Sequence, residues 1–158
     1  MRIALLSNPS SGRGRHAAAD DVARRLLTEA GHEVLHVRGS SYEQARDAGR
    51  ALLGDGPHRN VEALVVVGGD GMVHLGVDIV ATTGVPLGIV ATGTGNDIAR
   101  HFGLPSRDAE ASARLMNQAL SGEGAITAVD AIYASRPDGT LLAPQRRWSL
   151  AVVSAGVD

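Results

Sequence analysis

The chain has 158 residues, of which 44% are apolar and 20% are charged, and its formal net charge is −2. This composition is typical of a globular protein, and it argues against a basic surface for general nucleic-acid binding. The absence of cysteine excludes disulfides, zinc–thiolate sites and a cysteine nucleophile. The absence of lysine, since all 15 basic residues are arginine, excludes a P-loop NTPase and Schiff-base chemistry.

The first apolar run, residues 1–6, is ended by polar residues too early to be the core of a signal peptide. No segment approaches the roughly 20 apolar residues that span a bilayer. We therefore expect a cytoplasmic protein.

Short apolar runs alternate with segments of helical periodicity over the first 124 residues. The runs predict strands at 3–6, 34–37, 61–67 and 87–91. The segments between and after them predict helices at 16–30, 41–54, 72–81 and 96–102, and from Ser106 or Asp108 to Leu120. This alternation predicts an α/β fold with a parallel sheet covered by helices on both faces.

Side-chain patterns predict how the first two helices are placed and where they begin or end. In the first helix Ala18, Val22, Leu26 and Ala30 recur every four residues and are expected to form the buried face, with Gly31 as the C-cap. Ser41, followed three residues later by Gln44, is typical of a capping box at the start of the second helix.

The pattern changes beyond Gly124. Residues 126–134 and 148–155 read as strands joined by a turn at 136–139, with no helix between them. This hairpin indicates a second, antiparallel unit, so we expect one domain at 1–124 and the beginning of another at 125–158. The abrupt end suggests the front half of a longer protein.

Three glycine-rich or polar turns each follow an apolar run: Asn8–Gly12, Gly68–Gly71 and Gly93–Asp97. In a parallel sheet of this order they lie at one edge, where α/β proteins bind ligands. Each turn leads into a helix, whose free N–H groups favour an anion, so together they predict a phosphate site without lysine. Arg13 and Arg15 either add charge to it or belong to a solvated loop.

Asp70 and Asp97 are negatively charged and would repel phosphates, so their place beside a phosphate site needs an explanation. Mg²⁺ held by one or two carboxylates and phosphate oxygens is one reason, and a hydrogen bond to a ribose hydroxyl is another. The alternative for Asp97, and equally for Asn96, is a helix cap. The hydroxyls of Thr92 and Thr94 contact either phosphate or the local turn.

Other site types find little support. Residues 12–17 match G-x-G-x-x-A after a strand, but the expected acid at the end of the second strand is missing: Glu33 is at its start and Arg38 at its end. The six histidines form no metal-binding cluster: His32 and His36 have the ligand spacing of a helix but lie at a predicted strand. Ser10 and Ser11 have no evident His–Asp partners for a hydrolase triad.

Taken together, these motifs resemble the diacylglycerol kinase catalytic domain family of lipid kinases, which includes bacterial diacylglycerol kinases and YegS-like lipid kinases. The resemblance covers nearly the whole chain. It rests on Asn8-Pro9-x-Ser11-Gly12, on Gly68-Gly69-Asp70-Gly71, and on Gly93-Thr94-Gly95-Asn96-Asp97-Ile98-Ala99-Arg100 followed by Phe102-Gly103-Leu104-Pro105. The Gly68-Gly69-Asp70-Gly71 motif is shared with NAD kinases and phosphofructokinases. The stretch from Gly93 to Arg100 is much more specific to the lipid kinases.

The resemblance implies an ATP- and Mg²⁺-dependent enzyme that phosphorylates diacylglycerol, with an N-terminal domain like that of NAD kinase and phosphofructokinase and a C-terminal β-sandwich domain. It implies a nucleotide site formed by Asn8, Pro9, Ser11, Gly12, Gly68, Gly69, Asp70, Gly71, Thr92, Gly93, Thr94, Gly95 and Asn96. It also implies catalytic or magnesium-binding roles, in part through water, for Asp70, Asp97 and Asp130; for Asp130 a polar residue entering a strand is the alternative.

Two departures from the family pattern matter. Met72, His74 and Leu75 stand where the family usually has Thr, Asn and Glu, which makes the nucleotide preference less secure. The family's proposed general base lies beyond Asp158, so the chain alone is expected to be inactive, with membrane contact through the missing domain and a homodimer possible. An NAD kinase-like enzyme and a non-enzymatic nucleotide-binding fragment stay open as alternatives.

Overall fold

The computed structural model describes residues 1–7, 15–37, 39–54, 60–133, 138 and 148–150. The predicted site residues Asn8, Pro9, Ser11 and Gly12, together with Ser10 and Arg13, lie outside the described residues, as do the side chain of Arg15 and most of the predicted turn at 136–139.

The predicted parallel sheet is confirmed. Its strands are β1 (Arg2–Ser7), β2 (Glu33–Val37), β3 (Ala63–Gly68) and β4 (Leu87–Ala91). They are all parallel, in the order β2-β1-β3-β4, so β1 and β3 are central. Every residue of β3 is buried, as expected for a continuous apolar run in a sheet covered on both faces.

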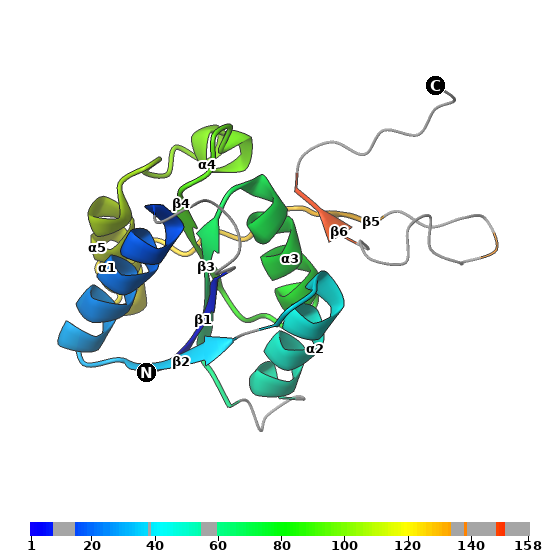
Figure 1. The fold of residues 1–158 in the computed structure, drawn as a ribbon, viewed down its shortest axis with the longest axis horizontal. Coiled ribbons are helices and arrows are strands. Elements are labelled where there is room, and N and C mark those ends of the chain that lie inside the picture. The colour runs from blue at the N-terminus through cyan, green and yellow to red at the C-terminus, as the bar shows by residue number, and fades with distance from the viewer. Residues whose placement is uncertain (8–14, 38, 55–59, 134–137, 139–147, 151–158) are drawn as a thin grey trace.

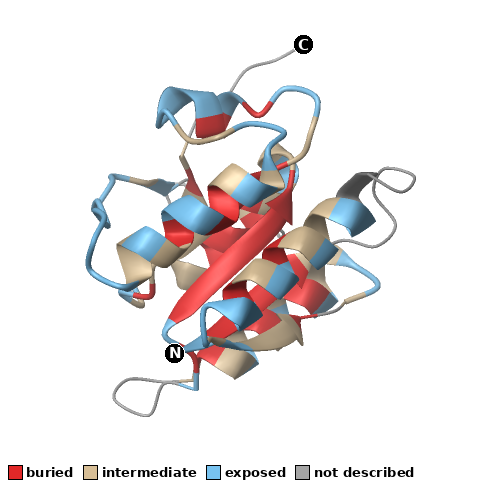
Figure 2. Ribbon diagram, turned by 90° about the vertical axis from the view of Figure 1, so that its left-hand side faces the viewer, coloured by how far each residue is buried: buried red, intermediate tan, exposed pale blue. Residues whose placement is uncertain are grey.

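Helices cover both faces of the sheet (Figure 1). They are α1 (Arg15–Glu29), α2 (Tyr42–Leu53), α3 (Asp70–Val80), α4 (Asp97–His101) and α5 (Ala109–Leu120). One core cluster joins the sheet to α1 and α5, and a second joins it to α2 and α3. Figure 2 shows the result, a buried sheet between helices whose outer faces are exposed.

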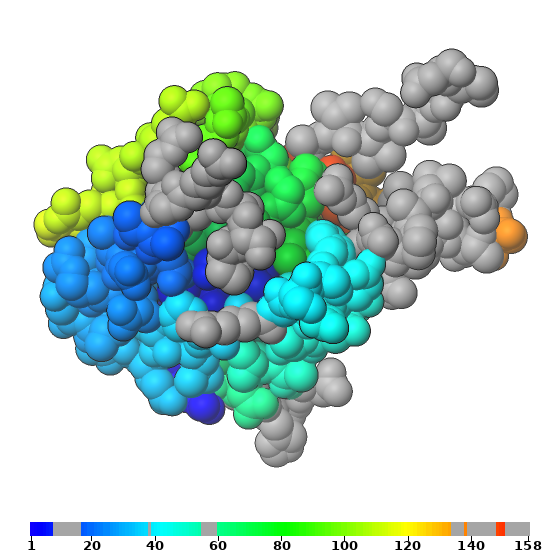
Figure 3. All heavy atoms as spheres, viewed as in Figure 1, coloured from blue at the N-terminus to red at the C-terminus, as the bar shows by residue number. Residues whose placement is uncertain are grey.

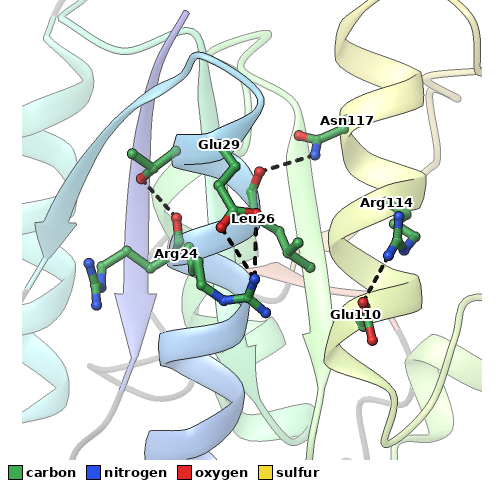
Figure 4. Close-up of polar contacts among 8 residues, drawn as sticks. Arg24, Leu26, Glu29, Glu110, Arg114 and Asn117 are labelled. Atoms are coloured by element: carbon green, nitrogen blue, oxygen red, sulfur yellow. Dashed lines mark hydrogen bonds and ion pairs between the residues drawn. The ribbon is translucent and has the colours of Figure 1, made fainter.

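The face of α1 that contacts the sheet differs from the predicted one. Ala23 and Leu27 are fully buried, whereas Ala18 and Ala30 are exposed. Because an α-helix has 3.6 residues per turn, a series spaced every four residues drifts around the axis and cannot stay on one face over four members. Leu26 is half-buried, and its carbonyl accepts a hydrogen bond from Asn117 Nδ2 of α5 at 3.5 Å (Figure 4).

The predicted caps are confirmed. Gly31 has φ +87° directly after α1, the left-handed conformation that glycine adopts without strain. Ser41 precedes α2, and its hydroxyl accepts from the N–H of Gln44 at 3.2 Å. Gln44 reaches back to the N–H of Ser40 rather than to that of Ser41. Asp108, not Ser106, caps α5 by accepting from the N–H of Ala111 at 2.9 Å.

Beyond α5 the chain reaches a small antiparallel pair, β5 (Ile132–Tyr133) with β6 (Trp148–Ser149). The pair lies beside α3, on the side away from α1 and α5 (Figure 1). The strand predicted at 126–134 is wrong over residues 126–131, which belong to no strand. Ile126 and Val129 are exposed there, so these apolar residues do not form a buried strand face within the described part of the chain. Within the described part of the chain, no helix is long and apolar enough to cross a membrane.

Candidate functional site

The loops after β3 and β4 meet at the carboxyl edge of the sheet. The N–H of Thr92 donates to the carbonyl of Gly68 at 2.9 Å. A Cβ built on Gly93 would lie 2.6 Å from the Cα of Gly69, a separation that real Cβ atoms do not adopt. The two predicted glycine motifs are thus in backbone contact, and this contact requires glycine at position 93.

Asp70 joins the two loops through its side chain. Its carboxylate accepts hydrogen bonds from the backbone N–H groups of Asp97, at 3.2 Å, and Ile98, at 3.1 Å. Asp70 therefore caps α4 from the neighbouring loop. Two N–H groups that we expected to face an anion at the start of this helix are already paired with a carboxylate.

The capping alternatives for Asn96 and Asp97 find no support in the side-chain contacts. Asn96 occupies the N-cap position of α4 but makes no capping hydrogen bond, and Asp97, the first residue of the helix, pairs with Arg100. Asn96 is 2% exposed with φ +54°. Its Nδ2 donates to the Gly93 carbonyl and to Ser106 Oγ, each at 3.0 Å, so it holds the loop together from inside.

Arg107 is a residue of this loop that sequence reasoning missed. Its Nη2 donates to the carbonyl of Thr94 at 2.8 Å and its Nε to the carbonyl of Gly93 at 3.4 Å. Its own N–H donates to the carbonyl of Ala91 at 2.7 Å. No sequence motif pairs position 107 with this loop; the contact exists because residues 106–107 run beside the end of β4.

The helix that begins at Asp70 carries two further polar side chains, His74 and Asp78, toward β6. Nδ1 of His74 lies 2.9 Å from the Asp70 carbonyl and Nε2 lies 3.1 Å from Ser149 Oγ. Because a carbonyl only accepts, Nδ1 donates, and Nε2 of a neutral ring then accepts from the hydroxyl. Asp78, 1% exposed, accepts from the N–H of Trp148 at 3.1 Å.

The departures from the family pattern have structural counterparts. Leu75 is 3% exposed and belongs to the core, so its position is apolar in this protein. Met72 lies under Gly68, since a Cβ on that glycine would meet Met72 Cγ at 2.4 Å. Met72 and Leu75 also line a pocket of about 220 Å³ at this edge, together with Ser7 and Tyr42.

The structure thus brings together the predicted residues of the second and third motifs, 68–71 and 92–97. A Cβ on Gly95 would lie 3.3 Å from Asp70 Oδ2 and 3.4 Å from Asp97 Oδ2, so these two carboxylates converge beside it. Asp130 is exposed between α5 and β5, and no group of three acidic or histidine side chains suited to a metal occurs among the described residues. The role of Asp130 stays a prediction.

His32 and His36 lie beside and within β2, the outer strand on the far side of the sheet from β4. His32 lies next to the start of β2, where burial, followed by the charge of the chain's N-terminus, lowers the pKa of its imidazole. His36 is within 3.9 Å of Asp20.

Comparison with known proteins identifies the family of the chain. The model of the diacylglycerol kinase catalytic domain matches residues 2–133. A diacylglycerol kinase of Mycobacterium tuberculosis is 36% identical over 115 residues, which are 73% of this chain and 36% of the relative. The chain therefore spans about a third of the length of the curated relatives that it matches.

Solved structures give the same fold. A diacylglycerol kinase from Bacillus anthracis str. Sterne superposes with a TM-score of 0.58 at 24% identity, over 74% of this chain and 39% of the other. A putative diacylglycerol kinase from the same organism superposes with a TM-score of 0.55 at 27% identity, over 74% and 40%. The chain belongs to the diacylglycerol kinase catalytic domain family.

Proposed function

We propose that this chain is the nucleotide-binding half of an ATP-dependent lipid kinase that transfers phosphate to the hydroxyl of diacylglycerol to give phosphatidic acid. The observation that carries the proposal is the bridge by Asp70 between two glycine loops in backbone contact. The family match supports the lipid acceptor, and the two loops support a phosphate-bearing donor.

Phosphoryl transfer depends mainly on holding the donor and acceptor in line and on neutralising charge on the phosphates. The loop from Thr92 to Asn96 and the glycines at 68, 69 and 71 would position the phosphates through backbone N–H groups. In the same scheme Asn8, Pro9, Ser11 and Gly12 would line the nucleotide pocket. Gly69 and Gly93 let the loops approach closely enough to act as one surface.

Magnesium fits the donor set of this edge. Asp70 and Asp97 converge beside Gly95, and Mg²⁺ is usually held by one or two carboxylates plus phosphate oxygens and water. These two residues would hold the ion, with Asp130 as a further ligand through water, and the ion would supply positive charge to the transferred phosphate. The same Asp70 carboxylate would keep α4 in place.

The division of the chain and its location complete the proposal. Residues 1–124 would form the ATP-binding domain, and residues 125–158 would begin the β-sandwich domain; the separate β5–β6 pair supports this boundary. We place the protein in the cytoplasm, at the inner face of the membrane, with membrane contact through the C-terminal domain. A homodimer is compatible with this proposal.

Phosphate transfer from labelled Mg·ATP by the full-length protein, assayed with diacylglycerol, sphingosine and NAD side by side, tests the proposal. Label in phosphatidic acid is the expected result. Label in NADP alone would instead assign the protein to the NAD kinases. Absence of label from all three products would reduce the proposal to nucleotide binding and point to Met72, His74 and Leu75.

Asp70→Asn in the full-length protein is expected to abolish turnover while the fold is retained. An amide offers one acceptor oxygen in place of two and carries no charge for Mg²⁺. Turnover and thermal unfolding are measured together, with Asp47→Asn as the matched control, because Asp47 is an exposed carboxylate on α2. Unchanged turnover of the Asp70 variant would remove this residue from the mechanism.

A further inference from the structure

We propose that Arg107 is a positioning residue for the nucleotide phosphates: it holds the carbonyls of Gly93 and Thr94 so that the following N–H groups face the phosphates. The inference rests on the proposed function, because it takes the loop of residues 92–96 to be a phosphate loop. In the space-filling view of Figure 3 the light-green region that contains α4, the helix directly after this loop, lies beside α3.

Arg107 sets the direction of two peptide groups in this loop. All described peptide bonds are trans, and in a trans peptide the C=O and the N–H of the same unit point in opposite directions. The carbonyls of Gly93 and Thr94 both accept from the guanidinium of Arg107. The N–H groups of Thr94 and Gly95 therefore point away from Arg107.

Within the described part of the chain, neither the N–H of Thr94 nor that of Gly95 has a hydrogen-bond partner, and both residues are exposed. The next N–H groups, of Asp97 and Ile98, are already taken by Asp70. The loop thus offers an anion two adjacent donors whose direction is set by Arg107, as in the backbone concavities that bind phosphate in other folds.

Arg107 is itself held in place through its backbone. Its N–H donates to Ala91 at the end of β4, and its φ of +60° is a conformation that non-glycine residues seldom adopt. A strained residue of this kind persists only where its surroundings determine it. The arginine is therefore fixed to the sheet on one side and to the loop on the other.

Charge supports the same assignment. A guanidinium makes charge-assisted hydrogen bonds in a planar fork, which suits two neighbouring carbonyls. The chain has no lysine for the phosphates, so an arginine that turns backbone donors outward and adds positive charge behind them provides a different route to phosphate binding.

The test compares ATP and adenosine binding to the full-length protein by calorimetry. Arg107→Met removes both hydrogen bonds without changing the backbone preference at a positive φ. Arg107→Lys restores one donor on a point charge. Arg114→Met is the matched control, since Arg114 lies on α5 and, among the described residues, pairs with Glu110 at 2.8 Å (Figure 4).

We expect Arg107→Met to bind ATP about tenfold more weakly, Arg107→Lys to fall between it and the parent, and Arg114→Met to match the parent. Adenosine affinity should not change, because adenosine has no phosphate. Arg107→Met with ATP affinity within about twofold of the parent, or with an equal loss for both ligands, would overturn the inference. A parent protein that binds ATP no better than adenosine would instead overturn the proposed function.

Discussion

Asp70 and Asp78 lie about two turns apart on α3, and each carboxylate accepts a hydrogen bond from the backbone of another segment. Asp70 stands at the start of the helix, is half-buried, and takes two N–H groups of α4. Asp78 is 1% exposed, and it takes the N–H of Trp148 in β6 and the hydroxyl of Tyr42. Two aspartates on one helix therefore bind the backbone of two different regions of the molecule.

The difference is one of access. The carboxylate of Asp70 lies beside Gly95 and the carboxylate of Asp97 at an open edge, where a metal ion or phosphate can reach it. Buried polar groups must be paired, and removing one partner leaves the other unsatisfied in a water-poor environment. We therefore interpret Asp78 as structural and Asp70 as both structural and functional, with His74 one turn from each.

Gly93→Ala should have the largest effect, because it breaks the contact that lets Asp70 reach α4. The added methyl would meet the Cα of Gly69 at 2.6 Å, and backbone cannot move aside as a side chain can. We expect a loss of about 3 kcal/mol in the free energy of unfolding, at the upper end of overpacking effects, together with a loss of ATP binding.

Gly71→Ala is the matched control for that substitution. Gly71 is exposed in the first turn of α3, and nothing lies within 4 Å of an added Cβ. Alanine favours helix over glycine by about 0.5–1 kcal/mol, so this variant should be as stable as the parent or slightly more so in urea unfolding. Equal losses in the two variants would show that the loops do not depend on their mutual contact.

Asp78→Ala should have the second largest effect on stability, and it tests the buried aspartate of the pair. It leaves the N–H of Trp148 and the hydroxyl of Tyr42 without this acceptor, and an unsatisfied buried group costs about 1–3 kcal/mol. We expect the free energy of unfolding, measured in urea, to fall by about 2 kcal/mol. ATP affinity should not change, because the glycine loops are untouched.

Asp47→Ala on α2 removes an exposed helical carboxylate paired with Arg46 and serves as the control for Asp78→Ala. We expect it to change the free energy of unfolding by less than about 0.5 kcal/mol. If Asp78→Ala lowered ATP affinity as strongly as Asp70→Asn, the distinction between a structural and a functional carboxylate would be wrong.

Much of the fold could be predicted from the sequence, because local signals and the fold agree. The run at 63–68, with three valines at its centre, is buried on both faces of the sheet. Gly31 and Ser41 end and begin helices as their residue types favour. The prediction was wrong where a pattern was weak: alanines in α1 marked the wrong face, and apolar residues at 126–131 formed no strand.

The glycines of the site could be predicted from the sequence, but the side chains that contact the site and its helix could not. The turns at 68–71 and 93–97 have glycines at fixed spacing, and the contact between Gly69 and Gly93 follows from adjacent parallel strands. The contacts of Arg107 with Thr94, and of Asp78 with Trp148, join residues far apart in the chain through side chains with no motif. Such contacts depend on tertiary packing, which a single sequence does not display.

His74→Phe should have the smallest effect and would test whether the two ends of α3 are linked. The imidazole contacts the Asp70 carbonyl and Ser149 Oγ, and phenylalanine keeps the ring but loses both hydrogen bonds, at a cost of about 1 kcal/mol. A double-mutant cycle with Ser149→Ala isolates the contact between the two side chains. A coupling of about 0.5 kcal/mol or more, with ATP affinity lowered in both single variants, would mean that β6 supports the Asp70 loop through His74. Additive changes would mean that β6 and the nucleotide loops are held by α3 independently, Asp78 serving one and Asp70 the other.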